Sequence, residues 1–163
     1  MTNAEKNIYR PRTLTRIASV QALFQWDQDS ECSMTTLIEQ FLLYRCSNKK
    51  CNKNDYEDGK TRIPNIELFR CVVEHFYLNR KKIDEAIVKV LPKDWPFERI
   101  DPIVRSILRS ATAEMIFHEQ NPPTAVIINE YLDVTHAFCE GDESTLINGV
   151  LNRLGKEVRL CLD

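Results

Sequence analysis

The charged side chains of this 163-residue chain form two blocks that could attract two different kinds of partner. Four cations precede Val20 and are opposed only by Glu5: Lys6, Arg10, Arg12 and Arg16. Between Ser110 and Asn152 there is no lysine or arginine, and this stretch carries seven acids: Glu114, Glu119, Glu130, Asp133, Glu140, Asp142 and Glu143. A polyanion and a basic protein would therefore be drawn to different parts of the molecule. The simpler alternative is that both blocks only cover solvated helix faces.

One local group of side chains could support catalysis or begin a metal site. Asp133 lies three residues before His136, and Cys139 and Glu140 follow it by three and four residues. On a helix these four side chains would share one face, where they could orient a catalytic imidazole or bind a metal ion. A helical histidine between acids is common, however, and no second ligand pair follows. Neither a catalytic residue nor a metal site is therefore expected.

The glycines and cysteines give little support for an enzyme either. The four glycines cannot form either of the glycine-rich phosphate loops. Of the six cysteines, Cys46 and Cys51 are close in sequence, but without a further Cys or His pair they make a weak zinc signal. A helical chain without a cofactor motif favours a binding protein that needs no cofactor.

Hydrophobic periodicity predicts helices along most of the chain. The expected helices cover residues 13–27, 33–42, 65–91 (as one helix or two), 101–120, 124–139 and 144–161. No stretch alternates with period two for long enough to predict a strand. The expected fold class is therefore all-α, with about seven helices.

The organisation expected is a single domain of ordinary size. Pro92 to Pro102 forms a natural seam between two halves. The polar segment 45–63 is long for a connection in a helical bundle. We interpret it as a plain insertion, with an extra nucleic-acid contact as the alternative, because Asp55, Glu57 and Asp58 interrupt its basic run. The start Met-Thr-Asn-Ala-Glu-Lys lacks an apolar secretory segment, which indicates a reducing cytoplasm, and no apolar run has the length of a membrane span.

Three segments carry a more specific pattern. They are Ser19-Val-Gln-Ala-Leu-Phe-Gln-Trp26, Asp101-Pro-Ile-Val-Arg-Ser-Ile-Leu-Arg109, and Ile128-Asn-Glu with Ile147-Asn-Gly-Val-Leu-Asn-Arg153. In content, order and spacing this pattern resembles the NusB family of bacterial transcription antitermination factors, over nearly the whole chain. The segment from Tyr131 to Glu143 is similar to the α-proteobacterial branch. The resemblance implies one RNA-binding domain, 1–163, built of two packed three-helix bundles at about 11–92 and 101–163.

The resemblance also implies partners and RNA-binding residues. NusB-like proteins bind the boxA element of ribosomal RNA transcripts with NusE, a small-subunit ribosomal protein, in the RNA polymerase antitermination complex. The family's RNA-binding arginines map onto Arg12 and Arg16, with Arg10 and Lys6 as helpers. Guanidinium groups suit the phosphates and base edges of single-stranded RNA. Asp142 maps beside the RNA, where it would temper phosphate attraction to the start of the last helix.

The protein contact implied for NusE lies at Phe24, Val104 and Arg105. Phe24 stands where relatives commonly carry tyrosine, and Val104 stands where some carry glutamate. The helix that contains Phe24 looks buried on most sides, so this ring could belong to the core instead. Gly149 is expected to permit the close approach of another helix.

Two other functions stay open at this stage. Some RNA methyltransferases carry a NusB-like RNA-targeting domain, but this sequence ends at Asp163 with no room for a methyl-donor fold. A protein-binding helical adaptor without an RNA site is the third possibility. The expected function is a non-enzymatic transcription antitermination factor.

Overall fold

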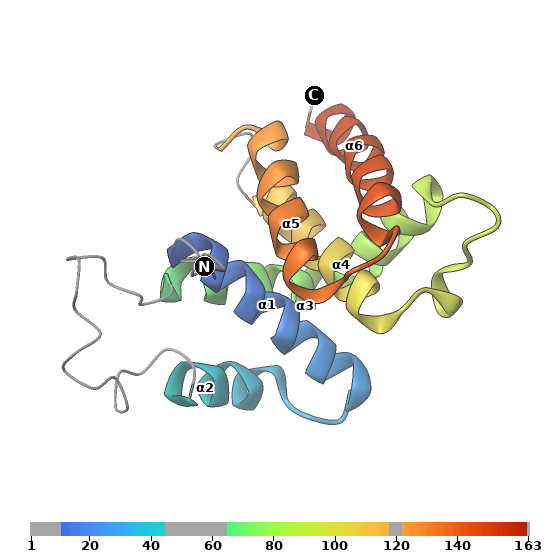
Figure 1. The fold of residues 1–163 in the computed structure, drawn as a ribbon. Coiled ribbons are helices and arrows are strands. Elements are labelled where there is room, and N and C mark those ends of the chain that lie inside the picture. Colours follow the sequence, from blue (N-terminus) through green and yellow to red (C-terminus); the bar gives the residue numbers. More distant parts are fainter. Residues whose placement is uncertain (1–10, 45–64, 118–121, 163) are drawn as a thin grey trace, which may run out of the picture.

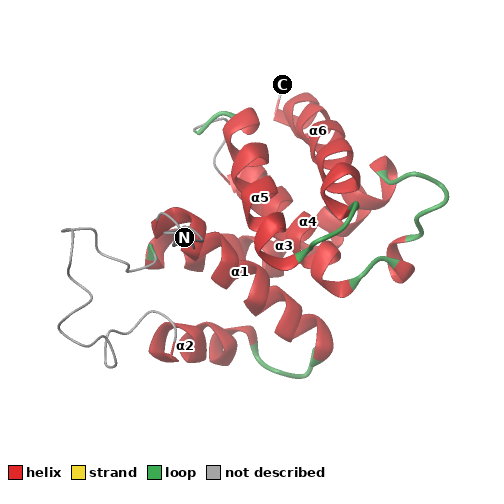
Figure 2. Cartoon of the chain, viewed as in Figure 1, coloured by secondary structure: helices red, strands yellow, loops and turns green. Residues whose placement is uncertain are grey.

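Six α-helices and one short 3-10 helix make up the part of the chain that the structure describes, and this part contains no strand. The structure is a computed structural model, and it describes residues 11–44, 65–117 and 122–162. In chain order the helices are α1 (Pro11–Gln28), α2 (Met34–Tyr44), α3 (Ile66–Val90), η1 (Phe97–Arg99), α4 (Pro102–Phe117), α5 (Thr124–Phe138) and α6 (Glu143–Leu162) (Figures 1 and 2). The all-α prediction is confirmed. None of the described helices is long and apolar enough to cross a membrane.

Helix α4 lies at the centre of the fold and packs against α1, α3, α5 and α6 (Figure 1). Every residue from Ser106 to Met115 is buried. Two hydroxyl groups of this stretch find partners within the helix: Ser106 Oγ donates to the Pro102 carbonyl over 2.8 Å, and Thr112 Oγ1 donates to the Leu108 carbonyl over 2.7 Å. Helix α4 therefore serves as the core of the fold, and its ends are the parts left to contact other molecules.

Buried apolar side chains from all six α-helices belong to one cluster. Helix α4 connects the first three α-helices to α5 and α6, so the core continues across the seam that the sequence predicted. The division into two three-helix bundles at about 11–92 and 101–163 stays a prediction.

Helix α3 bends at Asn79 but continues through the bend. Asn79 has non-helical backbone angles, φ −114° and ψ 15°, and its side-chain amide donates to the His75 carbonyl over 3.0 Å. A side chain bonded to a carbonyl near the bend is a common accompaniment of helix kinks. The sequence left open whether this region forms one helix or two. The structure describes six α-helices, and counting α3 as two helices at this bend would give the seven that the sequence predicted.

Helix α6 approaches a neighbouring helix closely at Gly155. A Cβ atom at Gly155 would lie 2.7 Å from Thr124 Cγ2 at the start of α5, whereas a Cβ atom at Gly149 would meet nothing within 4 Å. The expectation for Gly149 was therefore wrong. This glycine is exposed, and helical periodicity alone did not show that its side of α6 faces away from the other helices.

The two glycines of α6 are expected to respond to alanine in opposite directions. Gly149→Ala should raise the free energy of unfolding by about 0.5–1 kcal/mol, because glycine weakens a helix interior. Gly155→Ala should lower it by about 1–3 kcal/mol, because the short, stiff Thr124 side chain cannot move aside cheaply. Urea unfolding of both variants measures the pair. Equal effects of the two substitutions would contradict the packing described for α6.

Candidate nucleic-acid interface

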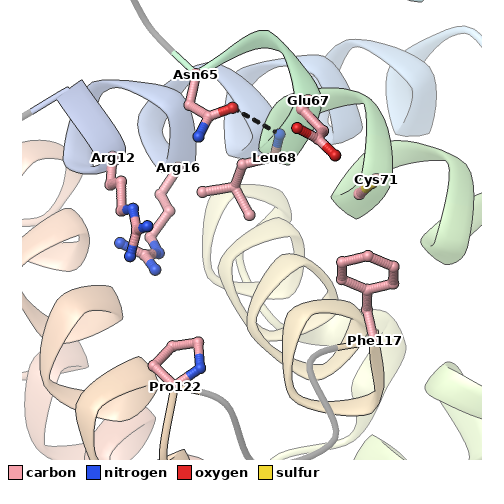
Figure 3. A pocket seen from close by; sticks show the side chains of 8 residues that line it. All are labelled: Arg12, Arg16, Asn65, Glu67, Leu68, Cys71, Phe117 and Pro122. Carbon is pink, nitrogen blue, oxygen red and sulfur yellow. Dashed lines mark hydrogen bonds between the residues drawn. The ribbon is translucent and has the colours of Figure 1, made fainter.

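The first turns of α1 place Arg12 and Arg16 on one helix face, because four residues separate them. The helix begins at Pro11, a residue suited to the first helical position. Arg12 is exposed, whereas only 2% of Arg16 is accessible. Figure 3 shows both side chains extending from α1 toward the same pocket. The two side chains thus point the same way, but Arg12 ends in solvent and Arg16 ends inside the fold.

Two acids from distant helices hold the guanidinium of Arg16. Its Nε and Nη2 donate to the two carboxylate oxygens of Glu114 on α4, over 3.0 and 2.6 Å. Its Nη1 donates to Glu130 Oε2 on α5 over 3.1 Å. Burial would lower the pKa of Arg16, but the hydrogen bond and the charge of Glu114 outweigh it and raise the pKa. Arg16 therefore stays protonated, and its charge is neutralised within the fold.

A buried tyrosine extends this ion pair. The Tyr131 hydroxyl lies 2.9 Å from Ser110 Oγ, and Arg16 Cζ lies 5.8 Å from the centroid of the Tyr131 ring. Burial, followed by the charge of Glu114, raises the pKa of Tyr131 well above its ordinary value, so the phenol stays neutral. We call Arg16, Glu114, Glu130, Tyr131 and Ser110 the Arg16 cluster. It fixes the start of α1 to both α4 and α5.

The Arg16 cluster bears on the role expected of Arg16. A phosphate would have to displace Glu114 or Glu130 to reach this guanidinium. The RNA-binding role of Arg16 stays a prediction, and these contacts support a positioning role, in which Arg16 holds the helix turn that presents Arg12. The sequence offered one hint, since Glu114 interrupts the apolar stripe of α4. Its partner on α1 is 98 residues away, however, and periodicity could not identify it.

A pocket of about 310 Å³ opens beside Arg12, where α1 meets the start of α3 and the end of α4 (Figure 3). Its lining residues are Arg12, Arg16, Asn65, Glu67, Leu68, Cys71, Phe117 and Pro122. We call it the Arg12 pocket. Within the described ranges, Arg12 forms no salt bridge. Its charge is therefore available to an anionic ligand in a way that the charge of Arg16 is not.

Asn65 holds the rim of the Arg12 pocket in place. Its Oδ1 accepts a hydrogen bond from the Leu68 N–H over 3.1 Å and so caps the N-terminus of α3. Its backbone N–H donates to Thr15 Oγ1 on α1 over 2.7 Å. The start of α3 is thereby tied to the start of α1. Two of the helices that line the pocket are fixed to each other at its edge.

Asp142 lies far from the Arg12 pocket. It is exposed, in the turn that leads from α5 into α6. Cys139 in this turn lies within electrostatic reach of Asp101, which precedes α4: burial raises the pKa of the Cys139 thiol, and the charges of Glu143 and Asp101 raise it further. Phe117, which lines the Arg12 pocket, ends the same helix. The 16 residues of α4 span about 24 Å. The structure therefore does not bring Asp142 and Arg12 together.

Several residues singled out in the sequence lie outside the described ranges, namely Lys6, Arg10, Cys46 and Cys51. The roles suggested for them stay predictions. In the described part of the chain, no group of three or more His, Cys, Asp or Glu side chains is placed to hold a metal ion, and the surroundings of His136 are included in that statement.

Comparison with known proteins identifies the family. The NusB family model matches residues 13–156. The chain belongs to the NusB family. The protein named Transcription antitermination protein NusB in Granulibacter bethesdensis is 39% identical over 150 residues, which are 92% of this chain and 90% of that relative. Its namesake in Gluconobacter oxydans is 37% identical over 147 residues, 90% and 88% of the two chains. The similar proteins are mostly α-proteobacterial, as the sequence pattern predicted.

Solved structures agree with the NusB fold. A structure of T. maritima NusB matches with a TM-score of 0.69 at 25% identity, covering 90% of this chain and 91% of that one. A structure named Crystal Structure of a Plectonemic RNA Supercoil matches with a TM-score of 0.70 at 22% identity, covering 91% and 96%. At that identity the second match supports the fold alone.

The residues that the NusB resemblance assigns to a protein partner lie toward the other end of α1. Phe24 is half-buried. Arg105 Nη2 donates to Asp27 Oδ2 over 2.5 Å, and its Nη1 donates to the Phe97 carbonyl over 3.2 Å. Val104 is 2% exposed and belongs to the core. Val104 therefore offers a partner no surface in this fold, because α4 is surrounded by other helices.

A second buried ion cluster lies at this end of α1, and the sequence did not predict it. Arg109 Nε and Nη2 donate to the carboxylate oxygens of Asp84 over 2.8 and 2.9 Å, and its Nη1 donates to Asp27 Oδ1 over 2.8 Å. The centroids of three aromatic rings lie 5.3–5.9 Å from Arg109 Cζ, those of Trp26, Phe76 and Phe97. We call Asp27, Asp84, Arg105 and Arg109 the Arg109 cluster. The four-residue spacing of the two arginines in an apolar stripe was the signal available in the sequence.

The two clusters define the arrangement of the central pair of helices. Arg16 pairs with Glu114, and Asp27 pairs with Arg105. Helices α1 and α4 therefore run antiparallel, with one ion cluster toward each end of the pair. Burial would raise the pKa of Asp27, but hydrogen bonds from Arg105 and Arg109 outweigh it and lower the pKa below its ordinary value. Asp27 is therefore ionised at neutral pH.

Proposed function

We propose that this protein binds boxA-type single-stranded RNA at the N-terminal end of α1 and the ribosomal protein NusE toward the opposite end. It would act in the cytoplasm, within the RNA polymerase antitermination complex. Membership of the NusB family supports the antitermination role, since the relatives carry that name. The observation that carries the RNA-binding half is Arg12. It is exposed beside a pocket and is presented by a helix turn that the Arg16 cluster holds in place.

On the RNA side, Arg12 provides the principal contact and Arg16 positions it. A guanidinium can donate two parallel hydrogen bonds to a phosphate, which gives direction as well as attraction. Lys6 and Arg10 would extend the cationic surface along the chain that precedes α1. Asp142 would temper the affinity of a strand long enough to reach the start of α6, at the other end of α4.

On the protein side, Phe24 supplies a half-buried ring and Arg105 a partly accessible cation. Val104 supports the start of α4 from inside the core. The acids between Ser110 and Asn152 suit a basic ribosomal protein, because complementary charge speeds encounter and disfavours wrong partners.

Replacing Arg12 with alanine is expected to weaken boxA RNA binding and to reduce its salt dependence. On single-stranded RNA, the removal of one phosphate interaction lowers the slope of log K against log salt by about 0.7. RNA titrations at several salt concentrations measure both quantities. Lys82→Ala is the matched control, because Lys82 is exposed on the later half of α3. An Arg12→Ala variant with the affinity and slope of the Lys82→Ala variant would exclude Arg12 from the RNA site.

One titration separates the proposed function from its rivals. BoxA-type RNA and a scrambled RNA of equal length are compared with NusE present. Tighter binding of the boxA sequence supports the proposal, and equal binding overturns it. Binding of NusE with no RNA binding would indicate a protein adaptor. Transfer of a labelled methyl group to RNA by this chain alone would indicate the methyltransferase class.

A further inference from the structure

The Arg12 pocket is electrically asymmetric. Figure 3 shows Arg12 on one side of it and Glu67 on the other, with Leu68 between them and Pro122 and Phe117 below. Arg16 adds little net charge, because Glu114 and Glu130 already pair with it. One side of the pocket therefore attracts an anion, the other repels it, and the wall between them is apolar.

A single nucleotide has the same asymmetry. Its phosphate is anionic, its base has an apolar face, and the base edge can carry amino groups that donate to a carboxylate. We propose that the Arg12 pocket takes one unstacked base of the bound RNA, with the phosphate at Arg12 and the base against Phe117. This inference rests on the proposed RNA-binding function and assigns the pocket a specific part in it.

The volume and the wall both suit a base. A pocket of about 310 Å³ lies at the lower end of the range found for small-molecule sites. Sequence-specific proteins commonly bind single-stranded RNA by splaying out individual bases and stacking them on aromatic rings. Phe117 is half-buried, and its ring centroid lies 4.5 Å from that of His75. The ring is therefore supported from within the fold while it lines the pocket.

The polar groups of the pocket can bind the edge of a base. Asn65 Oδ1 already accepts the Leu68 N–H, so the group that Asn65 has left to offer is its amide donor. Glu67 offers only acceptors when it is ionised. Adenine and cytosine present an amino group beside a ring-nitrogen acceptor, and uracil presents a ring N–H beside a carbonyl oxygen. A donor and an acceptor together therefore hold the base edge without selecting one of these bases.

The first experiment locates the base. A set of boxA-type RNAs, each with one abasic nucleotide at a successive position, is titrated against the wild-type protein. One position should cost about 5- to 150-fold in affinity, the usual effect of losing one base–aromatic stack. Phe117→Leu should remove the cost at that position alone, whereas Phe117→Tyr, which keeps the ring, should retain it. A Phe117→Leu variant with an unchanged abasic profile would overturn the inference.

The second experiment uses an exposed residue, so that it does not depend on how well the Phe117 variants fold. At the position found, the RNA that carries its base is compared with the abasic RNA. Glu67→Gln should reduce the affinity lost at the abasic nucleotide, because a neutral amide accepts a hydrogen bond from the base edge more weakly than a carboxylate does. Glu74→Gln, which changes an exposed acid further along α3, is the control and should leave that loss unchanged. A loss unaltered by Glu67→Gln would contradict the assignment of Glu67.

The outcomes distinguish this inference from the function on which it rests. If Arg12→Ala weakens boxA binding while Phe117→Leu leaves the abasic profile intact, the RNA site stands and the base pocket does not. If the wild-type protein fails to distinguish boxA from scrambled RNA, the proposed function itself fails.

Discussion

Replacing Glu114 with glutamine is expected to lower the free energy of unfolding by about 3–5 kcal/mol, a large part of the stability of a typical domain. Glu114 is fully buried and forms two charge-assisted hydrogen bonds with Arg16. Removing its charge leaves a buried guanidinium with Glu130 as its remaining acidic partner in the Arg16 cluster, and that acid is partly exposed. Urea unfolding monitored by circular dichroism measures the change.

Glu157→Gln provides the matched control for Glu114→Gln. It removes an acid from the ion pair with Lys89, in which Lys89 is exposed and Glu157 is half-buried. Exposed pairs contribute about 0–1 kcal/mol, so this variant should stay close to wild type. Similar losses of stability in the two variants would show that burial does not distinguish the two ion pairs.

The double variant Arg16→Met with Glu114→Leu tests whether Arg16 also touches RNA. Apolar replacement of a buried ion pair is often neutral, so the double variant should recover much of the stability lost in Glu114→Gln. If Arg16 only positions the first turns of α1, boxA affinity and its salt slope should be nearly kept. A fall in the slope comparable to that of Arg12→Ala would instead identify Arg16 as a second phosphate-binding residue.

Replacing Arg109 with methionine is the second change expected to have a large effect. It removes three hydrogen bonds and leaves Asp84 and part of Asp27 without their cation. The loss should be about 3–5 kcal/mol at neutral pH, since one partner of a largely buried pair is removed while the methionine still packs against the surrounding rings. Urea unfolding at pH 7 measures it. An effect below about 1 kcal/mol would contradict the role given to the Arg109 cluster.

The Arg109 cluster also predicts the direction of a pH effect. The pKa of Asp27 is lower in the folded protein than its ordinary value of 3.8, so the folded state favours the ionised form. The stabilisation that results is fully present above that value and is lost as the pH falls through the folded pKa. Arg109→Met removes part of it. The difference in stability between wild type and variant should therefore be largest above pH 3.8 and shrink below it, which unfolding at pH 7 and near pH 3 can measure.

Local signals in the sequence predicted the helices and several of their ends. The helix expected over 101–120 opens with Asp101 followed by Pro102, and Asp101 Oδ1 accepts the Ile103 N–H over 2.8 Å at the beginning of α4. Asn65 was expected to open the third helix, and it caps α3. Capping and periodicity depend on residues a few positions apart, so one sequence is enough to recognise them. The family pattern likewise predicted membership of the NusB family, which the match of the family model to residues 13–156 confirms.

Contacts between distant segments explain what the sequence did not predict. Arg16 looked like a surface cation because its acidic partners, on α4 and α5, are far from it in the sequence. The family resemblance placed Val104 at a protein contact, whereas α4 is surrounded along most of its length and Val104 lies in the core. The Arg12 pocket combines side chains from segments far apart in the chain. In each case the missing information was which helix faces pack together, and periodicity does not supply it.

The two ion clusters together fix both ends of α1 to α4. Salt bridges join it to α4 near its first turns and again near its last, so neither end can shift without breaking buried charge pairs. A ligand that moved α1 would have to supply the free energy needed to break these pairs. Any cooperativity between RNA and a ribosomal protein bound toward the two ends of α1 would then come from direct contact between those ligands. The length of the helix would set the distance between them.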